Sequence, residues 1–108
     1  MRMSSGTLLL SGLLVSGLLF SASTFAHEVE VSDYQFKPAE LHIRKGETVT
    51  WVNREKRTSH SVVLLGSGTE SERFFPDERW SHTFDAPGRY PYTCGPHPEM
   101  HGVVVVAD

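Results

Sequence analysis

A short segment near the carboxyl end of the chain brings three metal-binding side chains close together. Cys94, His97 and Met100 follow one another at three-residue intervals. A thiolate, two imidazoles and a weakly bound thioether form the ligand set of a blue-copper electron-transfer centre. This segment provides three of those four ligands, and His60 is the best placed candidate for the second imidazole. The sequence therefore predicts a copper site made of His60, Cys94, His97 and Met100.

The same residue types also have ordinary structural uses. A lone cysteine is usually a small buried apolar residue, and a methionine often fills a gap in a core. Here Gly95, Pro96 and Pro98 surround the three side chains, which indicates a constrained turn and not a helix face. Zinc is the next metal to consider, but structural zinc sites typically use two or more cysteines and no thioether. The single cysteine excludes c-type haem attachment and iron–sulfur clusters.

Residues 1–26 predict a secretory signal peptide. Arg2 provides a positive charge, residues 8–20 are mostly apolar, and the segment ending at Ala26 has the character of a cleavage site. Serine and glycine interrupt the apolar stretch, which is short for a membrane span, so a retained anchor is the weaker alternative. Cleavage after Ala26 leaves residues 27–108, which is 108 − 26 = 82 residues. That length suits one small domain of an exported, periplasmic protein.

The charge balance argues against a nucleic-acid-binding protein. The chain has 10 Lys and Arg residues and 13 Asp and Glu residues, a net charge of −3. Without the leader the balance is 9 − 13 = −4. Three basic residues at positions 54–57 precede His60, and four acidic residues at positions 70–78 follow it. Such a dipolar surface could orient a redox partner, although a run of charge is more often a solvated loop.

The other four histidines are weaker ligand candidates. His101 directly follows Met100 and could compete as the axial donor, but adjacent residues seldom both face one metal, so we favour Met100. His42 and His82 lie in alternating stretches and are most simply outward-facing strand residues. After cleavage of the leader, the α-amine and imidazole of His27 could chelate a second copper. We favour the simpler interpretation of His27, a polar residue at a frayed terminus.

After residue 26 the apolar pattern predicts short strands and no helix. Three segments alternate in polarity, and others are continuous enough to be buried strands. The predicted strands include residues 29–31, 41–43, 48–52, 61–65, 89–93 and 103–106. Turn signals separate them at residues 45–47, 66–68 and 85–88. About seven short strands in about 80 residues predict a single-domain, all-β fold, a small β-sandwich.

These strands explain how the four ligands would meet. If residues 89–93 and 103–106 form successive strands, the connection between them carries the three clustered ligands at one end of the sandwich. His60 opens the strand predicted over residues 61–65, so it could lie at the same end. A metal held in this way would be enclosed by a stiff scaffold.

Two segments carry a resemblance to a known family. Residues 44–53 read Arg-Lys-Gly-Glu-Thr-Val-Thr-Trp-Val-Asn within a longer similar stretch, residues 38–55, and residues 94–100 read Cys-Gly-Pro-His-Pro-Glu-Met. Together they resemble the cupredoxins, and among them the amicyanins, across essentially the whole mature domain. The two-residue gap between the second histidine and the methionine is similar to the short amicyanin loop, whereas plastocyanin and pseudoazurin typically have four residues there. One departure is Ser59-His60-Ser61, where the family commonly has Pro-His-Asn, so a hydrogen bond near the metal is expected to be replaced or lost.

The resemblance implies a Greek-key β-sandwich with one type 1 copper ion that alternates between Cu(I) and Cu(II). It assigns the equatorial ligands to His60, Cys94 and His97, and the axial ligand to Met100. The implied function is a monomeric periplasmic electron shuttle and not an enzyme. Its partners would be redox proteins such as a c-type cytochrome, an oxidase or an amine dehydrogenase.

Two rival functions remain. A copper enzyme would need further histidine clusters and more than one domain. A periplasmic copper chaperone or storage protein would use exposed ligands in Met-rich or His-rich segments. The chain has three methionines, two of them in the leader, so the chaperone is the weaker alternative.

Overall fold

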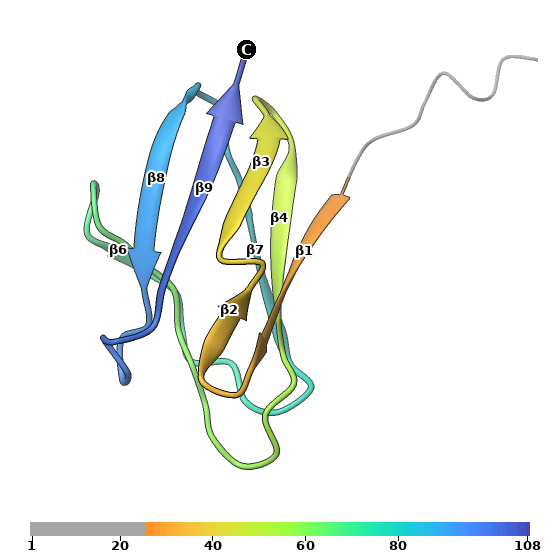
Figure 1. Cartoon of the computed structure of the whole chain (residues 1–108), viewed down its shortest axis with the longest axis vertical. Coiled ribbons are helices and arrows are strands. Elements are labelled where there is room, and N and C mark those ends of the chain that lie inside the picture. Colours follow the sequence, from red (N-terminus) through yellow and green to blue (C-terminus); the bar gives the residue numbers. More distant parts are fainter. Residues whose placement is uncertain (1–25) are drawn as a thin grey trace, which may run out of the picture.

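The computed structural model describes residues 26–108, so the predicted leader lies outside the described residues except for Ala26. This part of the chain forms nine short strands and no helix (Figure 1). Accordingly, it has no helix that is long and apolar enough to cross a bilayer. The strands are β1 (Ala26–Ser32), β2 (Gln35–Lys37), β3 (Glu40–Arg44), β4 (Thr48–Asn53), β5 (Val63–Leu64), β6 (Thr69–Glu70), β7 (Arg79–Thr83), β8 (Gly88–Thr93) and β9 (His101–Ala107).

The nine strands form two sheets that pack into a β-sandwich (Figure 1). One sheet has the order β2-β1-β4-β7 and the other has the order β3-β9-β8-β5-β6. Two pairs, β1 with β4 and β3 with β9, are parallel, and the remaining pairs are antiparallel. The predicted all-β sandwich is confirmed. The strand count exceeds seven because β2 has only three residues and β6 only two, too few to show alternation.

The core lies between the two sheets and follows the alternation of each strand. Side chains at every second position face the same side of a sheet. Accordingly, Val29 and Val31 of β1 and Val49 and Trp51 of β4 are fully buried. Tyr92 of β8 packs edge-on against Trp51, with ring centroids 5.3 Å apart. These contacts give the ligand-bearing loops a rigid base.

One end of the sandwich gathers the segments predicted to carry the site (Figure 1). Residues 94–100 connect the end of β8 to the start of β9. The short strand β5 pairs with β8, with Val63 opposite Thr93. This pairing places the residues before β5 beside the β8–β9 connection. We call this end of the sandwich the ligand end.

Asn53 holds the loop that leads to His60. Its fully buried side-chain amide donates to the Thr58 carbonyl at 2.9 Å and to the Phe74 carbonyl at 3.0 Å. His60 and Phe74 also exchange two backbone hydrogen bonds, at 3.1 and 2.9 Å. The loop is therefore tied to the sandwich at both of its ends.

Candidate metal centre

The structure brings His60, Cys94 and His97 into one cluster. The Cys94 Sγ atom lies 3.5 Å from His60 Nδ1 and 3.7 Å from His97 Nδ1. The three potential ligand atoms all lie within 4.8 Å of one another. Cys94 and His60 are buried, whereas His97 is only partly buried. Two backbone segments that are 34 residues apart in sequence thus meet at one point.

This spacing fits a single metal ion. A first-row metal typically bonds sulfur at about 2.3 Å and imidazole nitrogen at about 2.0–2.1 Å. With bond angles between tetrahedral and trigonal, these lengths separate the sulfur from each nitrogen by about 3.5–3.8 Å. The separations of 3.5 and 3.7 Å match this range. One thiolate with two imidazoles and a nearby thioether is a donor set suited to copper.

Burial keeps both buried donor groups neutral in the protein alone. It raises the pKa of the Cys94 thiol, against the opposing effect of backbone N–H groups of Ser61 and His97. Burial also lowers the pKa of His60, and the Glu55 carboxylate opposes this shift. A bound cation reverses the balance for the thiol, because a coordinating thiol is deprotonated.

Met100 and His101 lie in different surroundings. The Met100 side chain is 3% exposed and belongs to the same buried cluster as Cys94. Its backbone N–H donates to the His97 carbonyl at 2.9 Å, which closes the turn of the loop. His101, the first residue of β9, is exposed. Of the two candidates for an axial ligand, the thioether is the one on the buried side of the loop.

Glu55 lies behind His60 and was not found from the sequence. Its Oε2 atom accepts the Tyr34 backbone N–H at 2.8 Å and lies 3.4 Å from His60 Nε2. The Glu55 side chain is only 12% exposed. The contact to His60 is too long for a strong hydrogen bond, yet a carboxylate on the far side of a ligating imidazole is a common means of orienting the ring.

Ser61 and Glu70 join the two ligand-bearing segments. The buried Ser61 hydroxyl donates to Glu70 Oε2 at 2.9 Å and accepts the Gly95 backbone N–H at 3.0 Å. A Cβ atom at position 95 would lie 2.6 Å from Ser61 Oγ and closer still to the Glu70 carboxylate. Residue 95 must therefore be glycine for this contact to form. At the position after His60, where the resemblance implies an asparagine, Ser61 and its acidic partner Glu70 contact the ligand loop.

Tyr34 covers the exposed edge of the cluster. The β1–β2 turn holds it in the left-handed region, at φ 56°. Its ring packs edge-on against His97, with centroids 4.9 Å apart, and against His60 at 5.9 Å. Because Tyr34 is itself 49% exposed, it forms part of the surface above these two histidines.

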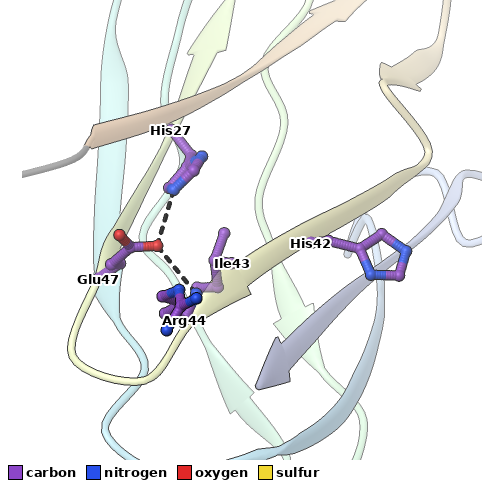
Figure 2. A pocket seen from close by; sticks show the side chains of 5 residues that line it. All are labelled: His27, His42, Ile43, Arg44 and Glu47. Carbon is purple, nitrogen blue, oxygen red and sulfur yellow. Dashed lines mark hydrogen bonds and ion pairs between the residues drawn. The ribbon is translucent and has the colours of Figure 1, made fainter. Parts of the chain in front are cut away.

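The structure places His27 and His42 at the end of the sandwich opposite the ligand end. There β3 ends at Arg44, paired with Ala107 of β9. Figure 2 shows His27 Nε2 and the Arg44 backbone N–H both directed at Glu47 Oε1, each at 2.9 Å. His27 also pairs with Val49 within β1 and β4, so the expectation of a frayed terminus is wrong. His42 is exposed, as expected, and points away from that pair (Figure 2).

The expectation for His82 is also wrong. His82 pairs with the buried Val49 and therefore faces the interior. Its ring stacks on Trp80, with centroids 5.6 Å apart, and packs edge-on against Phe84 at 4.7 Å. His82 is an inward, partly buried residue of an aromatic row and not an outward-facing one.

Comparison with known proteins gives consistent matches. Residues 6–106 match the family model described as Cupredoxin-like domain. The chain is 37% identical over 83 residues to amicyanin of Paracoccus denitrificans. This match covers 72% of this chain and 63% of that protein, just under two thirds of its length. It is 37% identical over 83 residues to amicyanin-alpha of Methylorubrum extorquens, covering 73% of this chain and 70% of that protein. The crystal structure of amicyanin from Paracoccus versutus is similar, with a TM-score of 0.70, 32% identity, and 75% and 80% of the two chains covered. The Cu(I) form of an amicyanin variant has a TM-score of 0.72 and 33% identity, with 79% and 85% covered.

Proposed function

The chain belongs to the cupredoxin-like domain family, and we propose that it is a periplasmic protein that binds one copper ion and shuttles single electrons between redox proteins. The observation that supports this most directly is the cluster of His60, Cys94 and His97, with Sγ to Nδ1 separations of 3.5 and 3.7 Å. Similarity to amicyanins, one of them determined in a Cu(I) form, supports the identity of the metal.

Each ligand has a distinct role in this proposal. His60, Cys94 and His97 would hold the metal, and Met100 would supply a fourth, weaker donor. The bound copper supplies the one-electron chemistry by alternating between Cu(II) and Cu(I). The protein holds the donors still: backbone N–H groups support the sulfur, and the sandwich core fixes both segments. Burial of three of the four ligands excludes water from the metal.

The location and partners belong to the same proposal. Residues 1–26 are a signal peptide cleaved after Ala26, and residues 27–108 form one copper-binding domain. The protein acts as a monomer without catalysing substrate chemistry. Its donor and acceptor are redox proteins, with a c-type cytochrome, an oxidase or an amine dehydrogenase as candidate classes. Sequencing the amino terminus of the exported protein tests the cleavage site, since any start other than His27 contradicts it.

Titration of the metal-free protein with Cu(II) tests the function. We expect one copper per chain, an intense visible band from thiolate-to-copper charge transfer, a narrow copper hyperfine splitting and reversible one-electron voltammetry. A colourless complex, or several loosely bound copper ions per chain, would instead favour a chaperone or storage protein. Exclusive binding of zinc in a competition with copper would also contradict the proposal.

A further inference from the structure

We propose that the redox partner of this protein binds through an acidic face, which docks on a basic surface beside His97; this inference rests on the function proposed above. The basic surface consists of Arg54, Lys56 and Arg57 in the β4–β5 loop, together with Arg73.

The partner must approach at the ligand end of the sandwich. Within the cluster, His60 and Cys94 are buried and His97 is partly exposed. Tyr34, which packs on His97, is half exposed beside it. A protein that contacts His97 therefore also contacts Tyr34 and whatever surrounds it.

Basic side chains surround Tyr34 on one side. A surface hollow is lined by Tyr34 together with Arg54, Lys56 and Arg57. The Tyr34 backbone N–H binds Glu55, which lies between these cations in sequence, so the turn and the loop are joined. The β4–β5 loop lies at the same end of the sandwich as the β8–β9 connection (Figure 1).

Arg73 extends the basic surface along the segment that carries His60. Its Nη1 atom donates to Ser59 Oγ at 3.1 Å, and Ser59 precedes His60. The guanidinium group is exposed. The cations thus flank the segment that leads to His60, with Arg54, Lys56 and Arg57 before it in the chain and Arg73 in contact with Ser59.

The acidic groups near this surface neutralise it only in part. Within residues 26–108, Lys56 and Arg57 make no ion pair. Arg54 lies 3.7 Å from the exposed Asp77, a weak surface pair. Glu55 is turned inward toward His60. Asp33 lines the same hollow but pairs with Lys37 at 2.8 Å. Glu70 and Glu72, which precede Arg73 in sequence, and Glu99 in the ligand loop are exposed. The positive excess is therefore confined to the hollow, on a chain whose net charge is −3.

Such local charge selects a partner by its electrostatics. A charged surface beside a binding site raises the association rate of an oppositely charged partner by about 10- to 1000-fold at low ionic strength. It slows a partner of the same sign. A carboxylate-ringed redox protein fits this surface, and a lysine-ringed one does not.

Oxidation of the reduced copper protein by two small complexes tests the local charge. Hexacyanoferrate(III), an anion, and tris(phenanthroline)cobalt(III), a cation, each accept one electron from Cu(I) and become the M(II) complex. The double variant Lys56→Gln/Arg57→Gln is compared with Arg44→Gln/Lys45→Gln, which removes the same charge at the opposite end of the sandwich. At low ionic strength we expect the first variant to slow the anion about tenfold and to accelerate the cation. Equal effects of the two variants would overturn the proposal.

Salt and a peptide probe complete the test. The difference between variants should vanish at about 1 M salt, where the Debye length is about 3 Å. In an NMR titration, hexaglutamate should shift the resonances of Tyr34, Lys56 and Arg57, and hexalysine should not. Binding to phosphatidylserine vesicles without binding to hexaglutamate would overturn the proposal in favour of a membrane surface. A colourless protein that is not reversibly reduced would refute the proposed function, whereas a normal copper centre with charge-insensitive rates refutes the docking surface alone.

Discussion

Replacing Ser61 by alanine tests the contact that joins the two ligand-bearing segments. The Ser61 hydroxyl donates to Glu70 and accepts the Gly95 backbone N–H, at 2.9 and 3.0 Å. Gly95 follows the proposed thiolate ligand directly. Alanine removes one oxygen from a fully buried position and leaves the backbone N–H of Ser61 in place.

The expected loss of stability follows from the two hydrogen bonds. The bond to Glu70 contributes about 1 kcal/mol, because the exposed carboxylate regains water when the bond is lost. The Gly95 N–H is partly buried, and leaving it unpaired costs about 1–3 kcal/mol. We therefore expect Ser61→Ala to lower the free energy of unfolding by about 2–4 kcal/mol. Glu70→Ala should cost only about 1 kcal/mol, since the serine can still accept the Gly95 N–H.

Urea unfolding of the metal-free protein measures both variants without a contribution from metal binding. Both should lower the midpoint at an unchanged m-value. In a thermal scan, each kcal/mol should lower Tm by roughly 4–8 °C for a domain of this size. The copper-loaded Ser61→Ala protein should also show a shifted charge-transfer band. If Ser61→Ala costs no more than Glu70→Ala, the serine does not hold the ligand loop and the reasoning fails.

Three further predictions concern the metal and acid stability. Cys94→Ser should abolish the visible charge-transfer band while circular dichroism still shows the β-fold; a variant that stays blue would refute the thiolate assignment. Met100→Gln should lower the reduction potential by voltammetry and keep the colour, because a harder oxygen favours Cu(II); an unchanged potential would remove the methionine from the site. The Arg44 backbone N–H, and then His27, hold the pKa of Glu47 below its ordinary value of 4.5. The carboxylate thus contributes stability above that pH and loses it as pH falls through the lowered folded-state pKa. Glu47→Gln should flatten this acid dependence of urea stability, and equal slopes for both proteins would contradict the effect.

Local patterns in the sequence were sufficient for much of the fold and for the grouping of three ligands. Alternation in residues 48–52 predicted β4, and glycine and prolines around His97 predicted a constrained loop. Tyr34, Glu55 and Glu70 were missed because they reach the site through contacts between distant segments, for which no local pattern exists.

The alternation of apolar residues in the sequence contradicts the expectations for His82 and His27. Residues two apart in a strand share a face. His82 lies two residues from both Trp80 and Phe84, and His27 lies two residues before Val29. Each histidine therefore belongs to an inward row, and the alternation already present in the sequence indicates this.

The parallel pairing of β3 with β9 has a consequence for the order of folding and metal loading. It joins Glu40 to Val103, and so requires nearly the whole domain to be available before it can form. Sandwiches dominated by such distant pairings fold in about milliseconds to seconds, far more slowly than helical bundles. The strand β9 starts where the ligand loop ends, and the segment that carries His60 leads into β5, which pairs with β8. A complete copper site therefore exists only in the finished sandwich, so metal capture should be a late event that reports folding and does not direct it.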